Sequence, residues 1–193
     1  MTRTTLLACL LLGSGAAFAQ STANTVQRDI NQQQRIEQGL QNGALSTKEA
    51  STLEREESRV DRMQTNALKD GKLTPAEQAK LNQAQNKVSS DIYAAKHNGV
   101  TGNPQSASSQ RMQADVQRII NQQQRIENGV QNGSLTNREV AKLERGQSKV
   151  AKSEARAGSD GHVDASEQAH VQRAENHQSK HIYRQKHDAQ QKN

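Results

Sequence analysis

The chain has 193 residues, of which 31% are hydrophobic and only 2% aromatic, and it carries a formal net charge of +6. Its one cysteine is Cys9, so the rest of the chain can form no disulfide and offers no thiol nucleophile or thiolate metal ligand. The sequence contains no serine-hydrolase elbow, phosphate loop or zinc-peptidase motif, and no aromatic platform on which bases could stack. We therefore expect no enzyme, no organic cofactor and no nucleic-acid partner.

The first 19 residues have the features of a secretory signal peptide. Arg3 gives a positively charged start, residues 6–12 form a short apolar run, and Ala17-Phe18-Ala19 offers small residues for cleavage. The apolar run is too short for a permanent membrane anchor, and no later segment is apolar enough to span a bilayer. We predict an exported, periplasmic protein that is cleaved after Ala19 and has no transmembrane segment after cleavage.

The remaining chain is an internal duplication. Comparing each residue of 26–98 with the residue 90 positions later gives 35 identities in 73 pairs, without a gap. A unit of this length is too long for one helical-hairpin repeat and indicates a duplicated small domain. We expect a first helical repeat at 20–98, a flexible linker at 99–109, a second helical repeat at 110–188 and a disordered tail at 189–193.

Apolar residues recur at helical spacing in three segments of each repeat. The first expected helix runs from about Asn24 to Leu40, and its glutamine run (Gln32-Gln33-Gln34) is expected to face solvent. The second expected helix spans about 47–68 and the third about 75–97. Three helices joined by short turns predict an all-α fold of two tandem three-helix, up-down-up units. The apolar positions of the first repeat are Val26, Ile30, Ile36, Leu40, Ala50, Leu53, Val60, Ala67, Leu81, Ala84, Val88, Ile92 and Ala95.

Four turns separate these helices, and all four share one pattern. Each begins with Asn-Gly or Asp-Gly, continues with an aliphatic residue, and then has Ser, Thr or Asp three positions before a Glu. The glycine can take the left-handed conformation that ends a helix, and the later pair forms a capping box that starts the next one. The Gly and Glu positions are Gly43 and Glu49, Gly71 and Glu77, Gly133 and Glu139, and Gly161 and Glu167.

The turns also resemble the second half of an EF-hand calcium loop. With Gly71 at the glycine position of such a loop, Asp70, Thr74 and Glu77 fall on oxygen-ligand positions. An earlier ligand position holds Leu68, however, and the corresponding positions of the other three turns also lack an acidic residue. Capping alone explains the matching residues, and binding of Ca²⁺ by Asp70, Thr74 and Glu77 is the alternative interpretation.

Three histidines share one face of the last expected helix. His170, His177 and His181 fall within about 40° of one another at about 100° per residue. His177 and His181 also have the i, i+4 spacing at which two imidazoles can share a metal ion. Their counterparts in the first repeat are two lysines and an aspartate, which favours an ordinary solvated face. A surface site for Zn²⁺, Cu²⁺ or Ni²⁺ at these three histidines is the alternative.

Three stretches resemble a group of small exported proteobacterial proteins that are helical and glutamine-rich. They are NQQQRIENG at 121–129, GSLTNRE at 133–139 and IYRQKHDAQ at 182–190. The resemblance implies a Gram-negative periplasmic setting and no particular chemical activity. We expect an interaction or structural role, with another protein or an anionic envelope surface as the partner. The alternative function is weak binding of a metal ion at one of the two candidate sites.

Overall fold

The structure, a computed structural model, describes residues 14–188 and is all-helical over that range, as predicted. The helices of this range are α1 (Ser14–Gln41), α2 (Thr47–Leu68), α3 (Pro75–Lys96), α4 (Ala107–Gln131), α5 (Asn137–Ala157) and α6 (Ala165–Lys186). Helix α1 begins at Ser14 rather than near Asn24, so its backbone continues through the predicted cleavage point. Residues 1–13 of the predicted signal peptide and the predicted tail at 189–193 lie outside the described residues.

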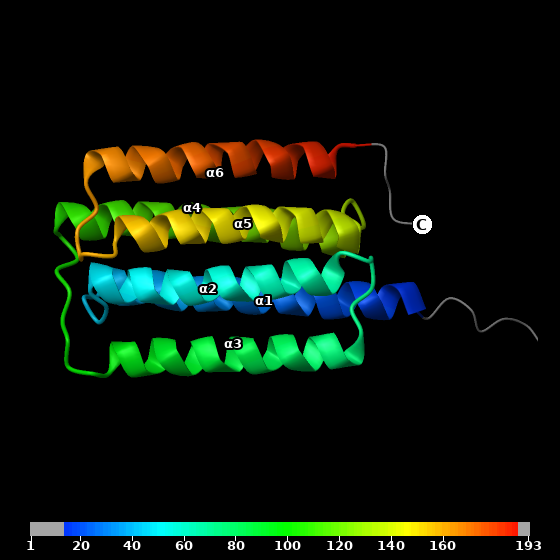
Figure 1. Ribbon diagram of the computed structural model, residues 1–193, viewed down its shortest axis with the longest axis horizontal. Coiled ribbons are helices and arrows are strands. Elements are labelled where there is room, and N and C mark those ends of the chain that lie inside the picture. Colours follow the sequence, from blue (N-terminus) through cyan, green and yellow to red (C-terminus); the bar gives the residue numbers. More distant parts are fainter. Residues whose placement is uncertain (1–13, 189–193) are drawn as a thin grey trace, which may run out of the picture.

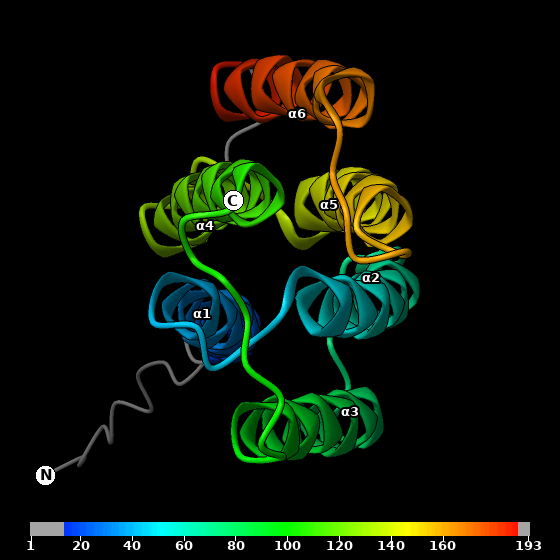
Figure 2. The same ribbon diagram turned by 90° about the vertical axis from the view of Figure 1, so that its left-hand side faces the viewer.

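The helices lie side by side along the long axis of the molecule in four layers (Figures 1 and 2). Helices α3 and α6 are outermost, while α1 with α2 and α4 with α5 form the two central layers. Helix α2 packs most extensively against α5, and α1 against α4. The packing is consistent with the predicted three-helix units, and it also docks the two repeats on each other. None of the described helices combines the length and apolar character that a bilayer span requires.

A pair of equivalent serines marks the centre of the interface between the repeats. Ser58 Oγ donates to the backbone oxygen of Ser148 at 2.9 Å, and Ser148 Oγ donates to that of Ser58 at 2.8 Å. The two residues are 90 positions apart, so each contacts its own copy. A residue that contacts its own copy lies on a two-fold axis, and the repeats are therefore related by an approximate two-fold rotation. The small side chains allow the backbones of α2 and α5 to approach closely.

The predicted apolar stripes and turns are confirmed. The stripe residues Val26, Ile36, Leu53, Leu81 and Ile92 are all at most 3% exposed. In every turn the Ser, Thr or Asp side chain accepts a hydrogen bond from the backbone of Glu, and the Glu side chain accepts one from the backbone of the capping residue. The glycines of the four turns have positive φ values, between 77° and 96°. The local signals of the four turns therefore determine where the helices joined by these turns end and begin, whereas α1 and α4 begin earlier than the sequence predicts.

The linker between the repeats contacts the first turn. The backbone nitrogen of Gly102 donates to the oxygen of Gly43 at 2.8 Å. A Cβ atom at Gly102 would lie 2.2 Å from the backbone oxygen of Leu45, so only glycine fits this approach. Asn98 Nδ2 also donates to Glu49 Oε1 at 2.6 Å. The flexibility predicted for residues 99–109 is therefore not shown by the structure.

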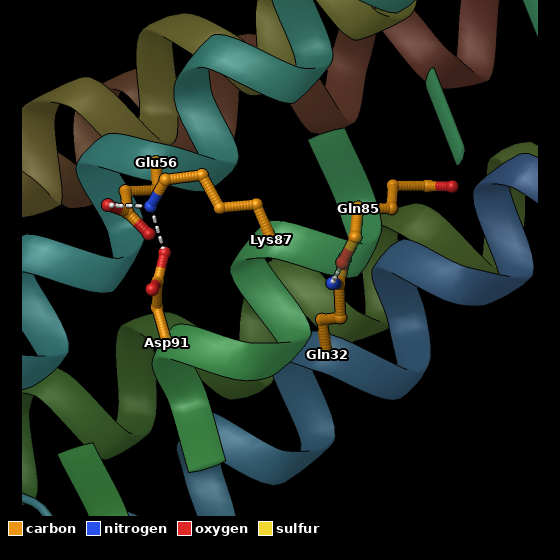
Figure 3. Close-up of polar contacts among 5 residues, drawn as sticks. All are labelled: Gln32, Glu56, Gln85, Lys87 and Asp91. Carbon is orange, nitrogen blue, oxygen red and sulfur yellow. Dashed lines mark hydrogen bonds and ion pairs between the residues drawn. The ribbon is translucent and has the colours of Figure 1, made fainter. Parts of the chain in front are cut away.

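The expectation that the glutamine run of the first helix faces solvent is wrong for two of its three residues. Gln32 and Gln33 are 2% and 3% exposed, whereas Gln34 is exposed. Gln32 Nε2 donates to the backbone oxygen of Gln85 at 2.6 Å (Figure 3). Gln33 Nε2 donates to Glu54 Oε2 at 3.1 Å. Because the central helices are covered on both sides, their polar face meets another helix, and amide hydrogen bonds replace those to water.

Candidate functional site

The residues of the predicted calcium turn act as a helix cap. Glu77 Oε2 accepts hydrogen bonds from the backbone nitrogen of Thr74 at 3.0 Å and from its hydroxyl at 2.6 Å. Asp70 Oδ1 accepts from the backbone nitrogen of Lys72 at 2.9 Å. Asp70 and Thr74 are exposed and Glu77 is partly exposed. One carboxylate oxygen of each acid is thus engaged in hydrogen bonds within the turn.

The structure brings together two of the three predicted histidines. His177 and His181 line the same pocket between α5 and α6. His170 lines a separate surface depression together with Glu167 and Arg173. The predicted set of three histidines therefore does not converge on one ion, and only His177 and His181 remain neighbours.

Among the described residues, one group of three metal-ligating side chains does converge. Asp29 on α1, Asp61 on α2 and Glu144 on α5 each place a carboxylate oxygen within 4.8 Å of the others. We call these three residues the carboxylate centre. They are 1%, 4% and 0% exposed, respectively, and lie where the two repeats meet. Two oxygens that each bind an ion at about 2.4 Å can be at most about 4.8 Å apart, so the spacing suits a single cation.

Amide side chains orient two of the three carboxylates. Asp29 accepts hydrogen bonds from Gln64 Nε2 and, at 2.6 Å, from Gln85 Nε2. Glu144 Oε2 accepts from Gln123 Nε2 at 3.3 Å, whereas Glu144 Oε1 has no hydrogen-bond partner. These amides fix the direction of the carboxylates without neutralising their charge, since an amide carries none.

A fourth buried carboxylate faces the centre. Glu57 lies one helical turn before Asp61 on α2, is 2% exposed, and has no hydrogen-bond partner on either oxygen. After burial, the charge of Asp29 is the largest cause that raises the pKa of Glu57, while Arg35 lowers it. A buried carboxylate without a partner is costly in its charged form. A proton or a bound cation must therefore offset the charge of this region.

Burial raises the pKa of all three members of the centre. It raises the pKa of Asp29 to about 7, against the opposing hydrogen bonds from Gln64 and Gln85. It raises the pKa of Glu144 to about 8, and the charge of Asp29 adds to this effect. Burial and then the charges of Glu144 and Asp29 raise the pKa of Asp61 well above its ordinary value. The centre can therefore hold protons near neutral pH or exchange them for a cation.

The second repeat has apolar side chains at the positions of Asp29 and Asp61, and the buried acids Glu154 and Glu175 at those of Gln64 and Gln85. The copies of Asp29 and Asp61 are Ile119 and Ala151, which form a small buried cluster with Val150. The same helix packing thus accommodates either acids or aliphatic residues at these positions. The two acids of the first repeat are consequently not required by the fold.

No sequence motif indicates the centre, because its residues lie on three helices and are far apart in the chain. The duplication nevertheless contains a signal. An acid in one repeat that aligns with an apolar residue in the other indicates a buried position. Asp29 aligns with Ile119, and Asp61 aligns with Ala151. Comparing the two repeats position by position therefore finds Asp29 and Asp61, but not Glu144, whose copy is Glu54.

The donor set of the centre consists of carboxylate oxygens alone. Such ligands suit hard cations such as Ca²⁺, Mg²⁺, Mn²⁺ or a trivalent lanthanide better than Zn²⁺ or Cu²⁺. Comparison of the chain with protein-family models, with curated proteins and with solved structures finds no match. The interpretation of the centre therefore rests on its geometry.

Proposed function

We propose that the protein is an exported, non-enzymatic protein that binds one hard cation at the carboxylate centre. The observation that carries this proposal is the convergence of three buried carboxylates within 4.8 Å of one another. Asp29 and Asp61 are buried at positions where the second repeat packs Ile119 and Ala151. Buried acids reduce stability relative to well-packed apolar residues. Their convergence with Glu144 is best explained by a ligand that the three carboxylates share.

Cation binding at this centre would compete with protons. The pKa values of Asp29 and Glu144 are raised to about 7 and about 8, so both carboxyls hold protons at acidic pH. A cation must displace these protons, and its affinity should therefore rise with pH. Because the ligands come from α1, α2 and α5, a bound cation would also link the two repeats and stabilise the folded chain.

Calorimetric titration with Ca²⁺, Mn²⁺ and Tb³⁺ tests the proposal, using the chain from Gln20 after treatment with a chelator. We expect one equivalent of cation near pH 8, an increase in Tm on binding, and an affinity at least about tenfold lower near pH 5.5. Asp61→Ala, which introduces the residue of the second repeat, should abolish binding. Glu154→Gln is the matched control, because it introduces the residue of the first repeat at a buried acid outside the centre.

Two outcomes would refute the cation site. One is the absence of binding by all three ions at millimolar concentration near pH 8. The other is an equal loss of affinity in Asp61→Ala and Glu154→Gln, because this would show that general electrostatics rather than the centre holds the ion.

Export to the periplasm is the part of the proposal that rests on sequence alone. It is supported by the charged start at Arg3, the apolar run at 6–12 and the small residues up to Ala19. Expression of the full chain in a Gram-negative host, followed by fractionation and intact mass measurement, tests it. A periplasmic product that begins at Gln20 is expected, and a full-length cytoplasmic product would contradict the assignment.

A role in protein interaction is a second candidate, and an exposed aromatic pair in each repeat favours it. Tyr93 stacks on His97 with ring centroids 4.1 Å apart, and Tyr183 stacks on His187 at 4.2 Å. The tyrosines are 62% and 60% exposed, near the C-terminal ends of the outer helices α3 and α6. Exposed tyrosines are typical of protein contact surfaces. A pull-down from periplasmic extract should recover a partner with the native chain and lose it with Tyr93→Ala/Tyr183→Ala.

A further inference from the structure

A pocket of about 310 Å³ lies between α5 and α6, and its polar lining is predominantly basic. Among the described residues that line it, none is acidic. Its apolar base includes Val150 and Ala174. The titratable side chains around it are Lys142, Arg145 and Lys149 from α5 and His177 and His181 from α6.

The equivalent surface of the first repeat is neutralised by acids. Lys87 Nζ lies 3.6 Å from Glu56 Oε1 and forms a second ion pair with Asp91 (Figure 3). The copies of these two acids in the second repeat are Gly146 and His181. The corresponding place between α5 and α6 therefore has neither carboxylate, and these acids do not neutralise its basic side chains.

Gly146 gives the pocket its shape. A Cβ atom at this position would lie 1.8 Å from Gln178 Oε1. The side chain of Gln178 occupies that space, and its Nε2 donates to the backbone oxygen of Leu143 at 2.9 Å. Gln178 is held against α5 in this way, and the second repeat has no side chain in the place of Glu56. The basic side chains therefore surround an open volume.

The charges around the pocket oppose a metal cation and favour an anion. Burial lowers the pKa of His181, and the positive charges of His177, Lys142, Arg184 and Lys149 lower it further. Additional positive charge is therefore unfavourable beside His181, whereas a negative ligand would relieve the repulsion. The histidine pair that the sequence offers to a metal is better placed to contact an anion.

We propose that this pocket binds a phosphate group. Arg145 can donate two parallel N–H bonds to phosphate oxygens, and Lys142 and Lys149 add two further charged donors. A volume of about 310 Å³ is sufficient for a phosphate group with a small substituent. Free phosphate compounds and the headgroup of an anionic lipid share this chemistry. The site is separate from the carboxylate centre and does not depend on the binding of a cation there.

Titration of the chain from Gln20 with inorganic phosphate and with pyrophosphate tests the proposal. The buffer has low ionic strength, near pH 6, and contains no divalent cation, since salt screens such contacts. We expect saturable binding by calorimetry and, by NMR, an increase in the pKa of His181 when the anion is bound. Lys149→Glu should weaken binding about tenfold or more.

Arg59→Glu is the matched control. Arg59 is the copy of Lys149 in the first repeat, both residues are exposed, and the change in net charge is identical. The affinity of this variant should stay within about twofold of the native value, because only the second-repeat surface forms the pocket. Circular dichroism spectra of both variants check that the helices are retained.

Vesicles distinguish the two sources of phosphate. Cosedimentation with phosphatidylglycerol vesicles is compared with phosphatidylcholine vesicles for the native chain and both variants. Binding of free phosphate or pyrophosphate that depends on Lys149 supports a soluble ligand. Binding of phosphatidylglycerol alone, with the same dependence, supports a lipid headgroup. The proposal is overturned if no probe binds at millimolar concentration, or if Lys149→Glu and Arg59→Glu weaken binding equally.

Discussion

The stability of the cation-free protein should fall as the pH rises from about 4 to about 8. Burial raises the pKa of Asp29 from 3.8 to about 7 and that of Glu144 from 4.5 to about 8. The folded chain therefore keeps protons in this range that the unfolded chain releases. Stability rises with pH only where the unfolded state binds more protons, and here the opposite holds. The contribution of these protonated carboxyls is complete below about pH 4 and is lost as the pH rises through about 7 to 8.

The size of the effect can be worked out for Asp29. Its pKa rises from 3.8 to about 7, a shift of about 3 pH units. At about 1.4 kcal/mol per unit, the free energy of unfolding should fall by about 4 kcal/mol over the range. Domains are typically stable by only about 5–15 kcal/mol, so this one group carries a large share. The carboxyls of the centre interact, and their separate contributions are not additive.

Urea unfolding at several pH values between about 4.5 and 8.5, in the presence of chelator, measures this dependence. Asp29→Asn removes the titrating group while keeping a polar side chain of the same size. The buried Gln64 Oε1, which has no hydrogen-bond partner, is available to accept from the new amide. We expect the fall in unfolding free energy to be smaller in the variant by up to about 4 kcal/mol.

Saturating Ca²⁺ provides an independent check, because a bound cation replaces the protons and should restore stability near pH 8. Asp70→Asn, at an exposed turn residue, serves as the control and should keep the native pH profile. The reasoning is refuted if the native chain is equally stable, or more stable, at the upper end of the pH range. It is also refuted if Asp29→Asn keeps the full native pH dependence.

Three further experiments test the packing and the carboxylate centre. Gly146→Ala should lower the free energy of unfolding, measured in urea, by about 1–3 kcal/mol, because the new Cβ overlaps the side chain of Gln178. This loss is expected although helix propensity alone favours Ala over Gly by about 1 kcal/mol. Adding Gln178→Val should recover most of the lost stability. Ser58→Ala should cost about 1 kcal/mol in the same assay through the lost hydrogen bond between repeats. The double variant Ile119→Asp/Ala151→Asp should create a second carboxylate centre. Its free energy of unfolding should fall between about pH 5 and about pH 8 by at least about 4 kcal/mol more than that of the native chain. Calorimetry should show a second equivalent of bound Ca²⁺.

The helices of the fold follow from local signals that can be recognised in the sequence. The capping pairs Thr74 with Glu77 and Thr136 with Glu139 start helices at the predicted residues, because the hydrogen bonds of a cap involve only neighbours in the chain. The apolar stripes predict the face of each helix that enters the hydrophobic core, and the main core cluster contains residues of both repeats. They leave undetermined whether the opposite face meets water or the other repeat.

The interface between the repeats could not be predicted for that reason. Polar residues such as Gln33 and Ser58 have the spacing of a solvated face, and nothing in a single helix distinguishes water from the polar face of another helix. The carboxylate centre depends on this docking, since Glu144 comes from the second repeat and Asp29 and Asp61 from the first. Local patterns therefore determine the helices, while the site depends on contacts between residues far apart in sequence.

The duplication itself allows one molecule to hold an acidic and an apolar version of the same position. The copy of Glu144 is Glu54, so a symmetric dimer of the first repeat would assemble Asp29, Asp61 and a glutamate of the partner twice. Two buried centres would then need protons or cations, and the loss of stability at high pH would be correspondingly larger. Joining the copies in one chain removes the requirement that they be identical. Ile119 and Ala151 remove two acids from the related position, where Glu54 is instead accompanied by the buried Glu154 and Glu175. Asp29, Asp61 and Glu144 are therefore kept together at only one of the two positions related by the approximate two-fold axis.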